Sequence, residues 1–115
     1  KNVEFEGYHC HIGSQIFDIK PFCDAGKIMI EYISHLKKEI GYEASILNLG
    51  GGFGVRYIDA QPELDYEEFI RLISKFIDEE VKLSGIKKPI IVMRKFIFWT
   101  VMRRKLILAA TLCPH

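Results

Sequence analysis

Hydrophobic and polar residues follow two different periods along this chain, and the period changes several times. Residues 2–12 alternate with a period of two, which predicts a strand. Apolar residues then recur at helical spacing over residues 22–40 and again over residues 69–81. Two short apolar runs, residues 45–49 and 89–93, have the length of buried strands. The predicted order is therefore strand, helix, strand, helix, strand.

Capping residues mark where the two helices begin and end. Asp18 suits the start of the first helix, and Gly41 suits its end. Asp65 and Glu68 have the spacing of a capping box in front of the second helix. The second helix is expected to end near Gly85.

The same periods predict which residues share a face. One face of the first strand should carry Val3, Phe5, Gly7, His9 and His11. The buried stripe of the first helix should consist of Phe22, Ala25, Ile28, Met29, Tyr32, Ile33, Leu36 and Ile40. The stripe of the second should consist of Phe69, Ile70, Ile73, Phe76, Ile77 and Val81.

Alternating strands and helices predict an α/β fold with parallel strands and right-handed crossovers. The chain supplies about three βα units, which make part of a (β/α)8 (TIM) barrel. Its 115 residues cannot close such a barrel, which takes roughly 250 residues. Residues 94–115 break the pattern: residues 96–101 suit a strand, and residues 106–112 suit either a helix or a strand.

Composition narrows the classes of function. Hydrophobic residues make up 49% of the chain and charged residues 27%, which is typical of a globular domain. The net charge of +1 gives no reason to expect a nucleic-acid partner, and no apolar run is long enough to span a membrane. Three cysteines without close spacing favour a reducing compartment, so we expect a cytoplasmic protein.

Two loops carry the candidate chemistry, and each follows a predicted strand. The first contains His11 and Ser14, and the second contains Gly50, Gly51 and Gly52. Ligands of parallel α/β folds bind at the carboxyl ends of the strands. Consecutive glycines let backbone N–H groups approach an anion, a serine hydroxyl adds a donor, and a histidine offers a flat ring. The pattern fits a phosphate carried on a ring.

Each of these residues also has a simpler structural explanation. Three glycines after a strand also make a tight turn, and Ser14 also suits a loop. A single histidine such as His11 is often structural, and we interpret His9 in that way. The run His9-Cys10-His11 is not a convincing metal site, because neighbouring residues of a strand point to opposite faces. We predict no metal site.

Two segments together resemble one known family. Residues 7–16 read GYHCHIGSQI and residues 47–55 read LNLGGGFGV. This combination closely resembles the diaminopimelate decarboxylases, which belong to the alanine-racemase-like group of pyridoxal-phosphate decarboxylases, and the resemblance spans about residues 2–93. Gln15 favours the diaminopimelate branch over the ornithine branch, which tends to have glycine there. Residues 1–93 are thus interpreted as a partial pyridoxal-phosphate-binding barrel domain.

The resemblance implies roles for the loop residues. His11 would stack on the pyridine ring of pyridoxal 5′-phosphate, and Ser14 with the backbone of Gly50, Gly51 and Gly52 would hold its phosphate. The implied reaction converts meso-diaminopimelate to L-lysine and carbon dioxide in lysine biosynthesis. The family further implies a homodimer of the full-length protein and a small amino-acid substrate.

The chain departs from the family in ways that bear on activity. The lysine that forms a Schiff base with the cofactor lies on an earlier strand in the family, and no lysine here matches it, so we assign no catalytic residue. After residue 93 the family has Glu-Pro-Gly-Arg, whereas this chain has Arg94 and Lys95. We hypothesise a reading-frame change near residue 94, which sequencing the locus would test. An unbroken frame with no decarboxylase-like alternative would contradict it.

These departures leave several functions open. The first is a fragment of a diaminopimelate decarboxylase that is inactive as this isolated chain. A second is a related decarboxylase of another basic amino acid. A third is a non-catalytic or degenerate relative.

Overall fold

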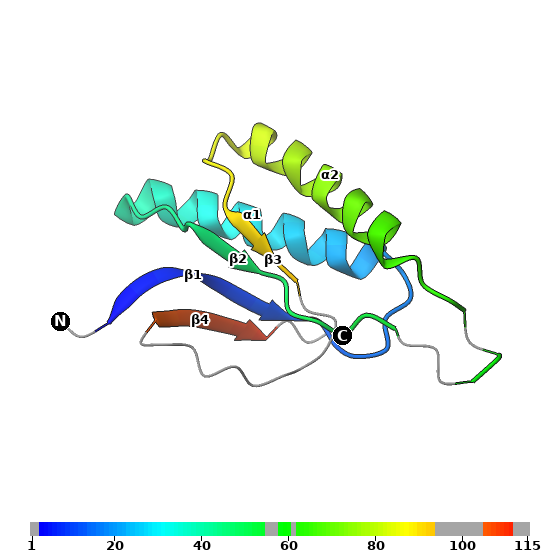
Figure 1. Ribbon diagram of the computed structural model, residues 1–115. Coiled ribbons are helices and arrows are strands. Elements are labelled where there is room, and N and C mark those ends of the chain that lie inside the picture. Colours follow the sequence, from blue (N-terminus) through cyan, green and yellow to red (C-terminus); the bar gives the residue numbers. More distant parts are fainter. Residues whose placement is uncertain (1–2, 55–57, 61, 94–104, 112–115) are drawn as a thin grey trace.

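The fold is a parallel sheet with two helices packed on one of its faces (Figure 1). The computed structural model describes residues 3–54, 58–60, 62–93 and 105–111. Its elements are β1 (Glu4–His11), α1 (Lys20–Ile40), β2 (Ile46–Asn48), α2 (Tyr66–Ser84), β3 (Ile90–Val92) and β4 (Lys105–Thr111). The five elements from β1 to β3 follow the predicted order, so the predicted βα units are confirmed.

The sheet is parallel throughout, in the order β3-β2-β1-β4. β1 pairs with β2 and β2 with β3, as neighbouring strands of a barrel do. β4 lies on the other side of β1, whereas the next strand of a barrel would lie beyond β3. Of the two elements considered for the tail, residues 105–111 form a strand, while residues 96–101 lie outside the described residues.

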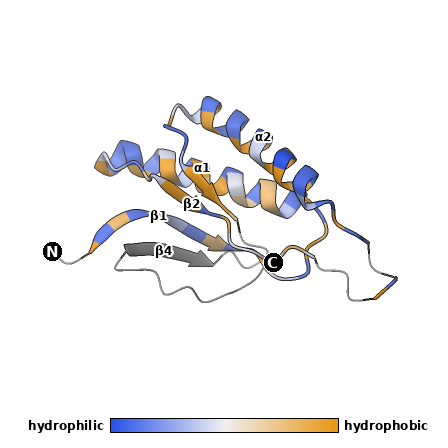
Figure 2. Cartoon of the chain, viewed as in Figure 1, coloured by the Kyte–Doolittle hydropathy of each residue, from blue (hydrophilic) through white to orange (hydrophobic). Residues whose placement is uncertain are grey.

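The hydrophobic core lies between the sheet and the two helices. Figure 2 shows hydrophobic and hydrophilic positions alternating around both helices, as expected for helices with one buried face. Fully buried side chains come from β1, β2, the residue after β2 and both helices, and the largest are Cys10, Phe22, Ile30, Ile33, Leu47, Leu49, Ile73 and Ile77. No helix in the described part of the chain is long and apolar enough to cross a membrane.

The predicted faces of β1 are correct for its second half and wrong for Phe5. Tyr8 and Cys10 are buried, and the ring of Tyr8 lies edge-on to that of Tyr32 in α1, so this face packs on the helices. Phe5 was expected on the opposite face, yet its ring centroid is 5.2 Å from that of Tyr8. The register with β4 shifts between Phe5 and Gly7. This irregularity turns Phe5 toward the helix side.

The buried stripes of the helices are narrower than predicted. Ile28, Ile40 and Ile70 are 48%, 69% and 41% exposed, and Tyr32 is 42% exposed, which corrects their assignment to the core. Gly26 and Ile30 are buried instead. A side chain at Gly26 would begin 3.2 Å from Cγ1 of Ile77, so this glycine lets α1 pack closely against α2.

Asp65 caps α2 as predicted, although the capping box is only half formed, whereas the N-cap residue of α1 is Ile19 and not Asp18. Asp65 accepts a hydrogen bond from the backbone N–H of Glu68 at 3.1 Å. The carboxylate of Glu68 does not complete the box, because it binds the guanidinium of Arg71 at 2.6 and 2.7 Å. Asp18 accepts from the backbone N–H of the first residue of α1. The helices end at the predicted glycines, Gly41 and Gly85.

Candidate functional site

The two loops singled out in the sequence lie side by side at the carboxyl edge of the sheet. The backbone N–H of Ile16 donates to the carbonyl of Gly52, and the N–H of Gly54 donates to the carbonyl of Ile16, both at 2.8 Å. These bonds form an isolated parallel bridge between Ile16 and Phe53. The loops meet because β1 and β2 are adjacent and parallel, so their carboxyl ends reach the same edge.

Gly52 is the point where the two loops come closest. Its φ is +93°, and a side chain at this position would begin 2.0 Å from the carbonyl oxygen of Gly13 and 3.6 Å from Cα of Ser14. Only glycine fits such a contact, because any Cβ would overlap the neighbouring backbone. The glycine turn, Gly50 to Gly52, is therefore pressed directly against the loop that carries Ser14.

The first amide of the glycine turn is already bound within the chain. Oδ1 of Asn48 accepts a hydrogen bond from the N–H of Gly50 at 2.8 Å, and the Asn48 side chain is buried. Among the described residues, no hydrogen-bond partner is seen for the N–H groups of Gly51 and Gly52. The N–H of Gly50 is thus used within the turn. The N–H groups of Gly51 and Gly52 remain as the donors that were predicted to bind a phosphate.

The polar side chains of the first loop lie near this turn. His11 is the last residue of β1 and is half-buried, and Ser14 is exposed in the loop that follows. Gln15 has a φ of 55°, which is uncommon for a residue other than glycine and which marks the loop as conformationally constrained. The structure therefore places the five predicted site residues at one edge of the sheet, on two loops that are hydrogen-bonded to each other.

An aromatic cluster supports the glycine turn from the side of the helices. Phe53 directly follows the glycines, and its ring stacks on Phe22 of α1 with centroids 4.6 Å apart and planes 15° apart. The rings of Tyr66 and Phe69 from α2 meet Phe53 edge-on. Both helices thus help to fix the position of the turn.

Asn48 shapes this site although it was not predicted from the sequence. The signal was present, because an asparagine just before a turn commonly binds a backbone N–H two residues later. Tyr66 was also missed, since its position at the start of a helix says nothing about a loop distant in the sequence.

The thiol of Cys10, in the strand that leads into the first loop, is shielded from solvent. Cys10 is fully buried, and burial raises the pKa of its thiol to about 11, so the thiol is neutral near pH 7. Within the residues that the structure describes, no three histidine, cysteine, aspartate or glutamate side chains lie together as a metal site would require.

Parallel strands joined by helices, with a glycine turn and a serine loop at their carboxyl edge, define an α/β domain of the class that binds ligands at this edge. The chain belongs to the family of the pyridoxal-dependent decarboxylases, because the model of their pyridoxal binding domain matches residues 1–94. Within this family it is similar to diaminopimelate decarboxylases. The recognition made from the two motifs is confirmed.

Two relatives illustrate the similarity. The diaminopimelate decarboxylase of Staphylococcus aureus is 38% identical over 89 residues, which are 77% of this chain and 20% of that protein. The crystal structure of the M. jannaschii diaminopimelate decarboxylase superimposes with a TM-score of 0.69 at 30% identity, covering 78% of this chain and 20% of the other. A second structure of that enzyme is a complex with L-lysine. The chain thus spans about a fifth of the length of these relatives.

Proposed function

We propose that this chain is a part of a pyridoxal-phosphate-dependent decarboxylase that binds the phosphate and the ring of the cofactor. The whole protein would convert meso-diaminopimelate to L-lysine and carbon dioxide. The observation that carries the proposal is the junction of the two loops at Gly52, which places the N–H groups of Gly51 and Gly52 beside the loop of Ser14. The names of the relatives and the lysine complex of the M. jannaschii enzyme support the choice of substrate.

The residues at the junction fit the cofactor. Two backbone amides and one hydroxyl form a set of neutral donors suited to a phosphate, and the absence of a side chain at Gly52 lets the turn lie directly against the loop that carries Ser14. The ring of His11, on the strand that leads into the loop, offers a flat surface for the pyridine ring. When bound, pyridoxal phosphate supplies an electron sink for the carbanion left by loss of carbon dioxide.

The part played by this chain is binding and orientation. The glycine turn and Ser14 would fix the phosphate, and His11 would fix the plane of the ring. We expect the isolated chain to be inactive, because none of its lysines matches the one that the family bonds to its cofactor. The whole protein is expected to be a cytoplasmic homodimer with an amino-acid substrate and with no nucleic-acid or membrane partner. Cys10 and Cys23 are free thiols, which agrees with a reducing compartment.

Ligand binding directly tests the proposed phosphate site, which consists of Ser14 and the glycine turn. Pyridoxal phosphate should bind the 115-residue chain in equilibrium dialysis, and pyridoxal, which lacks the phosphate, should bind far more weakly. Ser14→Ala should lower the affinity for pyridoxal phosphate roughly tenfold, because a hydrogen bond to a charged group is lost. Ser84→Ala is the matched control, since the Ser84 hydroxyl binds the carbonyl of Val81 at the end of α2. Equal binding of pyridoxal and its phosphate would contradict the proposal.

The substrate is tested in a complete enzyme. In a chimera, residues 3–93 replace the matching segment of the S. aureus diaminopimelate decarboxylase, which is 38% identical. This chimera should release carbon dioxide from meso-diaminopimelate and not from L-lysine or L-ornithine, while the 115-residue chain alone should release none. A chimera that folds and binds cofactor, yet prefers ornithine, would favour the related decarboxylase of another basic amino acid.

A further inference from the structure

The second histidine of β1, His9, was interpreted as structural from the sequence alone. Nδ1 of His9 is buried and has no hydrogen-bond partner in the described part of the chain. A buried nitrogen without a partner loses its bonds to water and gains nothing in return, so native proteins rarely keep one without a reason. A ligand that brings a polar atom to this nitrogen would remove the penalty.

The position of His9 in β1 points to the same ligand as the glycine turn. Tyr8 and Cys10 face the helices, so His9 lies with His11 on the opposite face of the sheet. His9 pairs in register with Asn48 of β2, the residue that holds the N–H of Gly50. Cε1 of His9 is 3.5 Å from the point where a side chain at Gly50 would begin. The imidazole therefore stands directly against the glycine turn.

His9 lies further from the carboxyl end of β1 than the proposed phosphate donors do. His11 ends β1, and His9 lies two residues earlier, which is roughly 7 Å deeper in the sheet. The amides of Gly51 and Gly52 and the hydroxyl of Ser14 lie in the loops beyond the strand ends. A ligand that places its phosphate on the loops would extend its ring toward the sheet, where His9 lies.

We propose that His9 is a further ligand-binding residue, whose Nδ1 forms a hydrogen bond with a polar substituent on the ring of pyridoxal phosphate. This inference rests on the proposed function. It assigns the two histidines of β1 different tasks: His11 contacts the face of the ring, and His9 recognises a group on its edge. Asn48, which pairs with His9, holds the N–H of Gly50.

Two substitutions of similar polarity test the role of Nδ1. The amide of asparagine reaches about as far as Nδ1 of histidine, and the amide of glutamine reaches about as far as Nε2. His9→Asn should keep most of the affinity for pyridoxal phosphate, whereas His9→Gln should lower it about tenfold. His9→Phe, which keeps a ring without nitrogen, should resemble His9→Gln. His35→Phe, at an exposed position of α1, is the control.

A second ligand separates the ring contact from the phosphate contact. Phenyl phosphate carries a ring without polar substituents, so its affinity should not change in His9→Gln or His9→Phe. Ser14→Ala should weaken the binding of both phenyl phosphate and pyridoxal phosphate. These dissociation constants are measured by equilibrium dialysis on the 115-residue chain and on the chimera defined above. The spectrum of bound pyridoxal phosphate in the chimera should shift in His9→Gln and not in His9→Asn.

The outcomes distinguish the two proposals. If Ser14→Ala weakens pyridoxal phosphate and the His9 variants bind it as well as the parent, the inference about His9 is wrong and the proposed function stands. Equal losses in His9→Asn and His9→Gln, or a parallel loss of phenyl phosphate binding, would also overturn the inference. If the binding of neither ligand depends on Ser14, the proposed function itself is wrong.

Discussion

The hydroxyl of Tyr66, the first residue of α2, donates a hydrogen bond to the carbonyl of Gly54 at 2.8 Å. Gly54 in turn donates its N–H to Ile16, and Ile16 donates to Gly52. A single series of bonds therefore connects the start of α2, the loop after β1 and the glycine turn. The start of α2 thus helps to hold the two loops of the site together.

Removing the hydroxyl of Tyr66 should loosen the site. Tyr66→Phe keeps the ring against Phe53 and leaves the carbonyl of Gly54 without this donor, so we expect a loss of about 1 kcal/mol in the free energy of unfolding. Because the turn is displaced, the affinity for pyridoxal phosphate should fall several-fold. Urea unfolding and ligand titration of the chimera measure the two effects.

Tyr42→Phe is the matched control for this prediction. The Tyr42 hydroxyl donates to the carbonyl of Phe5 at 2.9 Å, so its loss should cost similar stability. Tyr42 follows the end of α1, and its partner Phe5 lies near the start of β1, at the other end of the strand from the glycine turn. Cofactor affinity should therefore stay unchanged. A similar loss of affinity in both variants would show that Tyr66 acts through general stability alone.

Gly52 should tolerate no side chain. Gly52→Ala would place a Cβ 2.0 Å from the carbonyl oxygen of Gly13 at a φ of +93°, so the two loops must separate. We expect the free energy of unfolding to fall by at least about 2 kcal/mol and phosphate-dependent binding to be lost. Gly85→Ala is the control: its φ is +70°, but nothing lies within 4 Å of the new methyl group. Equal destabilisation of the two variants would contradict the close approach.

The order of elements could be predicted because each one carries a local signal. The spacing of apolar residues predicts the positions of β1, α1, β2, α2 and β3. Asp65 marks the start of α2, and glycines mark the ends of both helices. The position of β4 could not be predicted, since pairing with β1 is a contact between distant parts of the chain without a local pattern. The same limit explains Phe5, whose face changes at an irregularity that depends on the neighbouring strand.

The candidate site was predictable to a similar degree. Residues with distinctive chemistry, such as His11 and the three glycines, were predicted from their place at or just after the end of a strand, and the structure brings their loops together. The residues that shape the site were missed, because Asn48 and Tyr66 act through contacts that appear only in three dimensions. The sequence also could not show that the N–H of Gly50 is already engaged.

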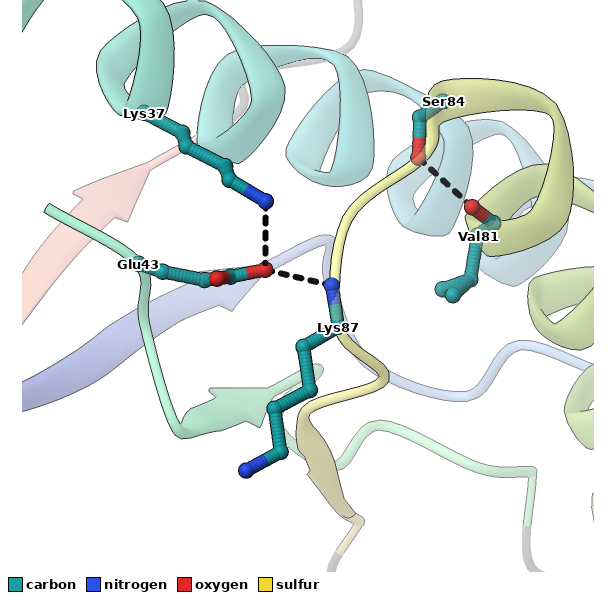
Figure 3. A network of polar contacts seen from close by, with 5 residues as sticks. All are labelled: Lys37, Glu43, Val81, Ser84 and Lys87. Atoms are coloured by element: carbon teal, nitrogen blue, oxygen red, sulfur yellow. Dashed lines mark hydrogen bonds and ion pairs between the residues drawn. The ribbon is translucent and has the colours of Figure 1, made fainter. Parts of the chain in front are cut away.

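The edge of the sheet opposite the site contains a polar contact that responds to pH. The carboxylate of Glu43, after α1, accepts from the backbone N–H of Lys87 and from Nζ of Lys37, joining the two segments that lead into β2 and β3 (Figure 3). The Lys87 N–H, followed by the Lys37 ammonium, lowers the pKa of the Glu43 carboxyl from its usual 4.5. A lowered pKa in the folded state means that this contact stabilises the fold above pH 4.5 and is lost as pH falls below it.

Glu43→Gln should remove this dependence on pH. At pH 7 the variant should unfold at a lower urea concentration than the parent, and the difference should shrink as the pH falls below 4.5, where the parent's carboxylate becomes protonated. Urea unfolding between pH 3 and pH 7 measures this trend. Glu79→Gln, at an exposed position of α2, is the control. A difference between Glu43→Gln and the parent that stays constant with pH would contradict the role of the charge.

The reactivity of Cys10 should report whether β1 stays packed against the helices. Only the thiolate reacts with iodoacetamide, and burial raises the pKa of Cys10 from 9.0 to about 11. At pH 8 this shift alone lowers the thiolate fraction about 100-fold, and full burial blocks access as well. In a Cys23→Ser, Cys113→Ser background, labelling followed by mass spectrometry should be slow in buffer and fast in urea. Pyridoxal phosphate should slow it further, because β1 and its loop are held closed.

The same thiol should make stability fall at high pH. The pKa of Cys10 is raised by folding, so its contribution is complete below pH 9.0 and is lost as the pH rises toward 11, where the unfolded thiol ionises first. Cys10→Ala should lower stability at pH 7, because it removes a fully buried sulfur, yet its stability should decline less steeply between pH 9 and 11. Parallel pH profiles for the two proteins, or rapid labelling of Cys10 in buffer, would show that β1 is not buried under α1 as the structure places it.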